Sequence, residues 1–133
     1  HLFDKLYVLV ANNINKNTLF TTEERVSLLQ ETLKDYQNVV VVTSKLLTVE
    51  FAKSVKAEAM IRGLRMVSDF EYELQLATLN KCLNDEIETI FIMSSHEYSF
   101  LSSSSVKEIA EFNGDVSKFV PLVVEKALKK KLN

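Results

Sequence analysis

Residues 59–77, AMIRGLRMVSDFEYELQLA, contain a complete change from strand to helix. The short apolar run Ala59 to Ile61 predicts a buried strand, which the segment Arg62 to Arg65 closes. Ser68 and Glu71 then have the spacing of a capping box, and this predicts the start of a helix. Behind that start, apolar residues recur on one helical face at Phe70, Leu74 and Ala77. The stretch therefore predicts one strand followed by one helix.

The same alternation continues on both sides of this stretch. Three more apolar, β-branched runs predict buried strands, at Leu6–Ala11, Val39–Val42 and Thr89–Met93. Capping boxes at Thr21–Glu24 and Ser105–Glu108 predict two helix starts. Two further helices are predicted, one at Thr48–Val55 and one after Pro121. Four buried strands that alternate with helices predict an α/β fold, a Rossmann-like parallel sheet with helices on both faces.

Length and composition narrow the class of protein. With 133 residues, of which 47% are hydrophobic, we expect a single domain over residues 1–133. The formal net charge is −2, so no basic field is expected to attract nucleic acid or an anionic membrane. No apolar run approaches the ~20 residues that a membrane helix needs. A single cysteine, Cys82, and the lack of a signal-peptide pattern predict a cytoplasmic protein.

Candidate binding residues follow the predicted strands. In open α/β sheets ligands bind outside the carboxyl ends of the strands, so the side chains after each strand are expected to gather there. They are Lys16, Leu47, Thr48, Arg62, Gly63, Arg65, Glu73 and residues 94–104, with Tyr98 among them. Cations and free backbone N–H groups stabilise phosphate, so this set predicts a phosphorylated ligand. No His/Cys cluster has metal-ligand spacing, so no protein metal site is expected.

Each of these residues also has a purely structural interpretation. Lys16 can be a solvated lysine in a polar loop. Arg62 and Arg65 can pair with acidic residues of the next helix, at Asp69, Glu71 or Glu73. The serines of 102–105 can cap a helix, and the aromatic residues before them can be packing residues. Taken alone, the residues leave both interpretations open.

The order of two of these segments resembles bacterial phosphopantetheine adenylyltransferase. RGLR at 62–65, with SDFEYE at 68–73 and Gln75, is similar to that family's IRGLR-x-x-x-DFEYE-x-Q signature. FTTEER at 20–25, with Lys16 four residues before its Phe, resembles the family's FT-x-EER helix start. The block from RGLR to FEYE is the more specific of the two.

The second half of the chain extends the resemblance. YSFLSSS at 98–104, followed by VKE at 106–108, resembles the family's (W/Y)-S-(F/Y)-(I/L)-SSS-x-VKE segment. GDV at 114–116 and Pro121 match its GDV…(L/V)P ending. The resemblance thus covers essentially the whole chain.

The resemblance implies transfer of the adenylyl group of ATP, bound with Mg²⁺, to 4′-phosphopantetheine, which gives dephospho-coenzyme A and pyrophosphate. It places the phosphopantetheine site at Lys16, Thr48 and Arg62. It places the ATP site at Gly63, Leu64, Arg65, Glu73, Tyr98, Ser99, Phe100, Leu101, Ser102, Ser103 and Ser104. Lys16 and Arg65 are then the candidate catalytic residues, because such transfers need neutralisation of developing charge. The resemblance further implies a homohexamer, with dephospho-coenzyme A and coenzyme A as product or feedback ligands.

The start of the chain departs from the family. The family opens with a strand and a G-(T/S)-FDP-x-(T/H)-x-GH segment, whose His stabilises the transition state. Phe3 and Asp4 look like the end of the helix behind that segment, and His1 falls two residues before that Phe, so His1 is not the catalytic His. We therefore expect that roughly the first sixth of a usual domain is absent, including the strand at the switch point of the sheet. The chain by itself is then expected to be inactive.

Two other functions fit the same residues. One is adenylyl transfer to a different phosphorylated acceptor, such as nicotinate mononucleotide; Arg62 and residues 47–48 would then shape a different acceptor pocket. The other is a non-catalytic nucleotide-binding or interaction module, with which the absent His segment is compatible.

Overall fold

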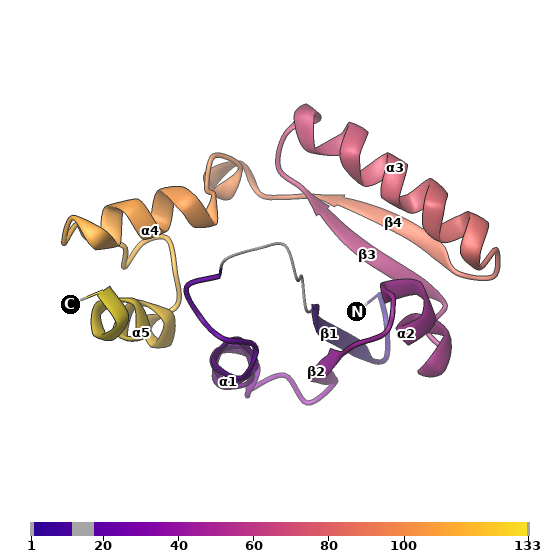
Figure 1. Ribbon diagram of the computed structural model, residues 1–133, viewed down its shortest axis with the longest axis horizontal. Helices are drawn as coiled ribbons and strands as arrows, with labels where there is room; N and C mark the ends of the chain where they lie inside the picture. The colour runs from indigo at the N-terminus through magenta and orange to yellow at the C-terminus, as the bar shows by residue number, and fades with distance from the viewer. Residues whose placement is uncertain (1, 12–17, 133) are drawn as a thin grey trace. The chain divides into compact units, whose positions relative to one another are not determined.

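A computed structural model describes residues 2–11 and 18–132 of the chain (Figure 1). The predicted site residue Lys16 lies outside them. The chain divides into two compact units, called here unit 1 (His1–Lys45 with Ser102–Asn133) and unit 2 (Leu46–Leu101). Each unit contains one pair of parallel strands.

The sheet of unit 1 consists of β1 (Leu6–Ala11) and β2 (Val39–Ser44). The two strands are parallel, and their register is unbroken over all 6 residues of each. Both are rich in β-branched and other apolar residues, which suits strands covered by protein on their faces. The predicted bounds of β1 are confirmed, and β2 runs on to Ser44.

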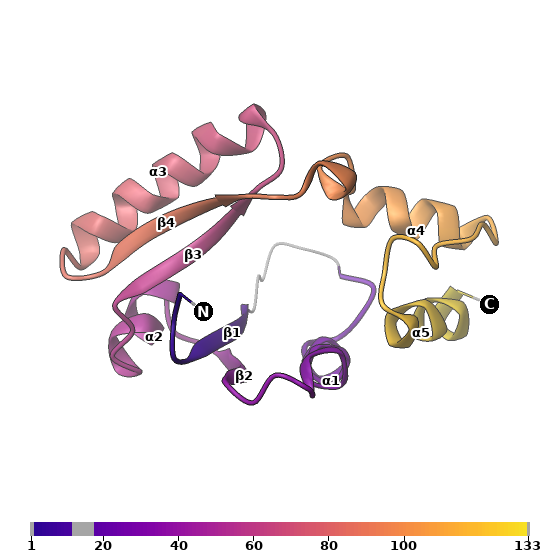
Figure 2. The same ribbon diagram turned by 180° about the vertical axis from the view of Figure 1, so that it is seen from behind.

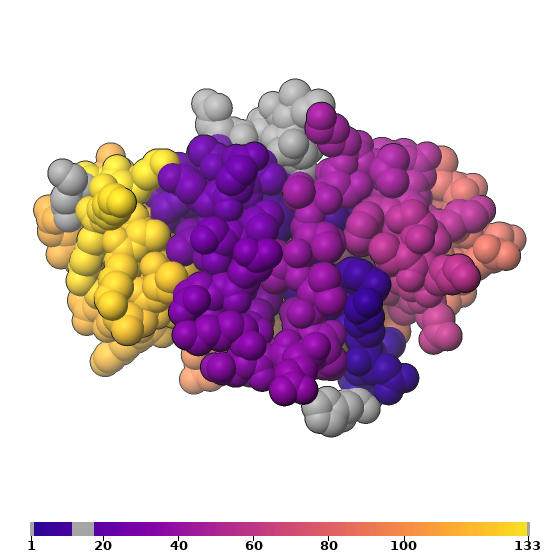
Figure 3. All heavy atoms as spheres, turned by 90° about the horizontal axis from the view of Figure 1, so that it is seen from below, coloured from indigo at the N-terminus to yellow at the C-terminus, as the bar shows by residue number. Residues whose placement is uncertain are grey.

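α1 (Thr22–Leu33) begins with a capping box. The Thr21 hydroxyl accepts a hydrogen bond from the backbone N–H of Glu24 at 3.2 Å, and the Glu24 carboxylate accepts one from the backbone N–H of Thr21 at 2.8 Å. The prediction for this helix start is confirmed. Lys131 of α5 (Leu122–Leu132) donates to the same carboxylate at 2.7 and 2.9 Å. α1 and α5 accordingly lie side by side (Figure 3).

α4 (Ser103–Glu111) begins earlier than the sequence pattern indicates. The hydroxyl of Ser102 caps it by accepting the backbone N–H of Ser105 at 3.0 Å, so the capping box predicted at Ser105–Glu108 is wrong. Val106 and Ala110 are buried on one side of α4, and α5 packs beside it (Figure 2). The serine run thus lies at the N-terminal end of this helix.

Unit 2 has its own small core. β3 (Ala59–Leu64) and β4 (Glu88–Met93) are parallel, with an unbroken register over 6 residues. α2 (Thr48–Ser54) precedes β3 and supplies apolar side chains to the core. That core consists of Val49, Ala52, Met60 and Ile87, with Ala57 packed against it.

α3 (Val67–Leu83) connects the two strands of unit 2 and lies alongside them (Figure 1). It begins at Val67 behind Met66, so Ser68 already lies in the first turn and the predicted Ser68–Glu71 capping box is wrong. The ring of Phe70 packs edge-on against Phe91 of β4, with 5.7 Å between the ring centroids. This contact holds the start of the helix on one face of the strand pair.

The fold class is the one predicted, an α/β fold with parallel strands joined through helices. The strands, however, pair two by two within the described residues, and not in one sheet of four.

Candidate functional site

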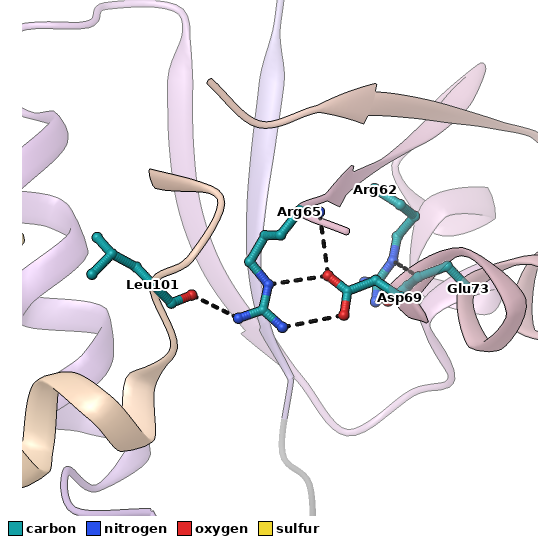
Figure 4. Close-up of polar contacts among 5 residues, drawn as sticks. All are labelled: Arg62, Arg65, Asp69, Glu73 and Leu101. Atoms are coloured by element: carbon teal, nitrogen blue, oxygen red, sulfur yellow. Dashed lines mark hydrogen bonds and ion pairs between the residues drawn. The ribbon is translucent and has the colours of Figure 1, made fainter. Parts of the chain in front are cut away.

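The carboxyl end of β3 carries the first candidate residue, Arg62. β3 is three residues longer than predicted, so Arg62 is a strand residue and its side chain reaches α3. Its Nε and Nη2 donate to the two carboxylate oxygens of Glu73 at 2.6 and 2.7 Å (Figure 4). This bidentate bond raises the pKa of Arg62 further above its ordinary value. Arg62 is therefore a permanently charged group in a fixed orientation.

Arg65 is the first residue after β3, and four hydrogen bonds fix its position (Figure 4). Its Nε donates to Asp69 Oδ2 at 3.1 Å, and its Nη2 donates to Asp69 Oδ1 at 3.2 Å. The backbone N–H of Arg65 donates to the same Oδ2 at 3.2 Å. Nη1 donates to the carbonyl oxygen of Leu101 at 2.7 Å. The carboxylate and the carbonyl together hold the guanidinium between α3 and the loop behind β4.

Asp69 is held in its charged form by these contacts. Hydrogen bonds from the Arg65 side chain, and then from the Arg65 backbone, lower the pKa of Asp69 below its ordinary value. The carboxylate is consequently ionised at neutral pH and acts only as an acceptor. From the sequence, Asp69 is a possible ion partner of Arg65 and not a predicted site residue, although its spacing of four residues from Arg65 is a usable signal.

Between the two arginines lie Gly63 and Leu64. Leu64 is buried at 5% exposure, so it contributes packing to unit 2. Gly63 is exposed, and a Cβ built on it meets no atom within 4 Å among the described residues. Its φ angle is not positive, so the backbone does not require a glycine here. A glycine inside a strand often marks a bulge, a tight bend or a place where a ligand or another backbone approaches closely, and the unbroken register of β3 with β4 shows no bulge here.

The loop behind β4 forms the other side of this site. The backbone N–H of Ser94 donates to the carbonyl of Leu64 at 2.8 Å, which keeps the ends of β4 and β3 together. A short 3₁₀ helix, η1 (His96–Tyr98), follows. The backbone N–H of Leu101 donates to the carbonyl oxygen of Tyr98 at 3.1 Å, which closes the loop. Tyr98 and Phe100 are 46% and 64% exposed, so neither serves as a core residue of unit 2. Both rings therefore lie largely at the surface of unit 2.

The remaining predicted residues are placed elsewhere in the two units. Thr48 is the exposed first residue of α2, in unit 2. Ser102 caps α4 in unit 1, and Ser103 and Ser104 are exposed in the first turn of that helix. The structure thus brings together Arg62, Gly63, Leu64, Arg65, Glu73 and the Tyr98–Leu101 loop. For Ser102 the capping interpretation is confirmed.

Two further observations concern ions and membranes. Within residues 2–11 and 18–132, no group of three or more His, Cys, Asp or Glu side chains could hold a metal ion. No helix in that part of the chain is long and apolar enough to cross a membrane.

Parallel strands joined by helices, with polar groups gathered at a strand end, are features of Rossmann-like α/β folds. The sequence profile of the cytidylyltransferase-like family matches residues 1–109 of this chain. The chain therefore belongs to the cytidylyltransferase-like family, and its general activity is nucleotidyl transfer.

Proposed function

We propose that the protein transfers the adenylyl group of ATP to 4′-phosphopantetheine, with dephospho-coenzyme A and pyrophosphate as products. The observation that carries the proposal is the pair of arginines at the end of β3. After binding their carboxylates, Arg62 and Arg65 each keep N–H groups that have no hydrogen-bond partner among residues 2–11 and 18–132. A transfer between two phosphorylated substrates needs two such cationic groups, one for each substrate.

The chemistry needs little from the protein beyond positioning and charge. A phosphate oxygen of phosphopantetheine attacks the α-phosphorus of ATP, a new P–O bond forms, and the bond to the β-phosphate oxygen breaks in line with it. The attacking phosphate is already ionised, so no general base is required. Negative charge accumulates on the departing pyrophosphate, and Arg65 is the residue we assign to stabilise it.

Arg62 is assigned to the acceptor. Its Nε and Nη2 edge is occupied by Glu73, which leaves Nη1 and one N–H of Nη2 for the phosphate of phosphopantetheine. Thr48 is assigned to the same substrate by the resemblance, and it offers a hydroxyl at the first position of α2. Lys16 belongs to this set by the resemblance, outside the described residues.

The nucleotide side of the site is assigned to the β3 end and the loop behind β4. The open backbone at Gly63 admits the nucleotide, and the exposed ring of Tyr98 suits stacking against a base. Mg²⁺ enters as the counter-ion of ATP.

The acceptor decides between the proposal and its alternatives. Purified natural gene product is incubated with Mg·ATP and either 4′-phosphopantetheine or nicotinate mononucleotide, and products are identified by mass spectrometry. We expect dephospho-coenzyme A and an equal amount of pyrophosphate with the first acceptor only. A dinucleotide formed from nicotinate mononucleotide would replace the proposal by the related adenylyltransferase. ATP binding in calorimetry without product from either acceptor would favour a non-catalytic nucleotide-binding module.

The same calorimetry tests the other proposed ligands. Dephospho-coenzyme A is expected to compete with both substrates, because it carries parts of each. Coenzyme A is expected to bind at the same site as a feedback ligand. Failure of both to displace phosphopantetheine would contradict this part of the proposal.

A further inference from the structure

We propose that Asp69 is a positioning residue for Arg65, whose carboxylate orients the guanidinium for the phosphates of ATP. The inference rests on the proposed function, and it gives a role to a residue that lies within the SDFEYE motif but is not among the predicted site residues. It follows from the hydrogen bonds of Asp69, which differ from those of an ordinary surface ion pair.

The first argument is the count of donors on Arg65. An arginine side chain has five N–H groups in one rigid plane. Asp69 accepts one from Nε and one from Nη2, and the Leu101 carbonyl accepts one from Nη1. The two that are left, one on each Nη nitrogen, have no hydrogen-bond partner in the described part of the chain. Because the guanidinium is planar, three bonds in that plane also fix the directions of the remaining two.

The second argument is the backbone contact. The Oδ2 atom that binds Nε also accepts the backbone N–H of Arg65, so one carboxylate fixes both ends of the residue. An exposed ion pair normally binds only the tip of a flexible side chain. Here the Asp69 carboxylate fixes both the backbone directly behind β3 and the direction of the Arg65 guanidinium. A ligand phosphate therefore meets an arginine whose rotamer freedom is already lost.

A structural role for Asp69 makes a different prediction. Asp69 lies in the first turn of α3, where a carboxylate stabilises the helix through the dipole whether or not Arg65 is present. Removing the carboxylate also makes the site more positive, and this by itself favours a triphosphate. Orientation and charge thus have opposite effects on ATP affinity. The direction of the change on neutralising Asp69 consequently separates the two roles.

The test is a double-mutant cycle read by ATP affinity. Asp69→Asn is compared with wild type, with Arg65→Ala and with the double variant, by calorimetric titration of Mg·ATP. We expect Asp69→Asn to raise the Kd for ATP roughly 3- to 10-fold, the effect of ordering one long side chain. In the Arg65→Ala background the same change should cause no loss of ATP affinity, because Asp69 orients ATP only through Arg65 and the lost negative charge favours the triphosphate. Glu31→Gln, which removes an exposed ion pair of α1 with Lys34, is the matched control and should leave the Kd unchanged.

Thermal unfolding of each variant accompanies the titrations. An unchanged or lower Kd in Asp69→Asn would overturn the proposal, as would an equal loss of affinity in both backgrounds. If wild type binds no ATP, the proposed function itself fails, and this inference with it. Asp69→Glu is the second variant: it keeps the charge in the first turn but moves the carboxylate, so we expect weaker ATP binding at an unchanged melting temperature.

Discussion

At the scale of single residues, the two arginines illustrate what spacing determines. Asp69 and Glu73 are four residues apart, so they lie on the same side of α3 and bind Arg65 and Arg62 respectively. The sequence already limited the candidates to three acidic residues, but it could not choose among them. The choice depends on β3 continuing to Leu64, because this extension puts Arg62 in the strand and Arg65 directly behind it. Strand ends are the part of a fold that local pattern determines least.

The different assignments of the two arginines predict different kinetics. Arg65→Ala should lower kcat about 10²–10³-fold, as removal of a positioned transition-state donor does. Arg65→Lys should recover only part of the loss, because it keeps the charge without the planar fork. Arg62→Ala should mainly raise the KM for 4′-phosphopantetheine. Steady-state kinetics of the natural gene product, with both substrates varied, measure all three.

If the two ion pairs are purely structural, the alanine variants should lose stability and keep a near-normal kcat. Both arginines are about half exposed, and exposed pairs contribute about 0–1 kcal/mol to stability. The melting temperature should therefore fall only slightly in either alanine variant. Normal kcat in a destabilised Arg65→Ala protein would remove Arg65 from the catalytic residues.

Gly63 offers a test in which stability and binding separate. A Cβ at this position meets nothing within 4 Å among the described residues, and the backbone is compatible with alanine. Gly63→Ala should leave stability unchanged or raise it by about 0.4–1 kcal/mol, because alanine restricts the unfolded chain. ATP affinity should fall nonetheless if the nucleotide approaches the backbone here. Equal ATP affinity of the variant and wild type in calorimetry would show that the site does not use this opening.

At the scale of secondary-structure elements, helix starts were predicted with mixed success. The capping box at Thr21 and Glu24 is present, whereas the two patterns at Ser68 and Ser105 are not. In both failures the helix begins upstream, behind Met66 or Ser102. A serine followed by an acidic residue three positions later occurs by chance within a helix, so the pattern identifies a cap only where the preceding backbone leaves the helix.

The end of α4 is specified more strongly than its start. Asn113 has a φ of 59°, its N–H donates to Ala110 at 3.0 Å, and the N–H of Gly114 donates to Ile109 at 2.8 Å. This is the hydrogen-bond pattern of a Schellman motif. A Cβ on Gly114 would lie 2.6 Å from Ile109 Cγ2 and 3.0 Å from its carbonyl oxygen. Glycine is therefore required at 114 by crowding, while 113 needs a residue that tolerates the left-handed region.

Substitutions at these two positions should have opposite effects. Gly114→Ala must displace Ile109 and is expected to destabilise the protein by about 1–3 kcal/mol. Asn113→Gly relieves the left-handed conformation and should be neutral or slightly stabilising. Urea unfolding of both variants, followed by circular dichroism, measures the difference. Equal stability of Gly114→Ala and wild type would mean that the α4 terminus adjusts at no cost.

At the scale of the whole molecule, the sequence predicted the alternation of strands and helices and the class of fold, but not the pairing of the strands. Apolar runs report that a strand is buried, and they carry no signal for which strand lies beside it. The arginines and their loop were found because motif and topology agreed at one strand end. The assignment of Lys16 and the serines to the same site remains a prediction from resemblance.

The exposed apolar side chains of α3 bear on how copies of the molecule assemble. Tyr72, Leu79 and Leu83 are 63%, 59% and 64% exposed, and their spacing of seven and four residues puts them in one stripe along the helix. The resemblance implies a homohexamer, and an apolar stripe of this kind is suited to contact between copies. Full burial of a leucine side chain contributes roughly 1.5–3 kcal/mol, so two per interface are enough to decide an association equilibrium.

We therefore expect the natural gene product to be an oligomer, and the double variant Leu79→Lys with Leu83→Glu to reduce its mass. The two substitutions add opposite charges, so the net charge of the helix stays the same while its apolar stripe is interrupted. Leu122→Lys, at an equally exposed position on α5 (64%), is the control for replacing one surface leucine and should leave the mass unchanged. Light scattering at several concentrations gives the mass of each protein. A wild-type monomer at working concentration would refute the expected assembly, and an unchanged oligomer in the double variant would place the interface on another surface than α3.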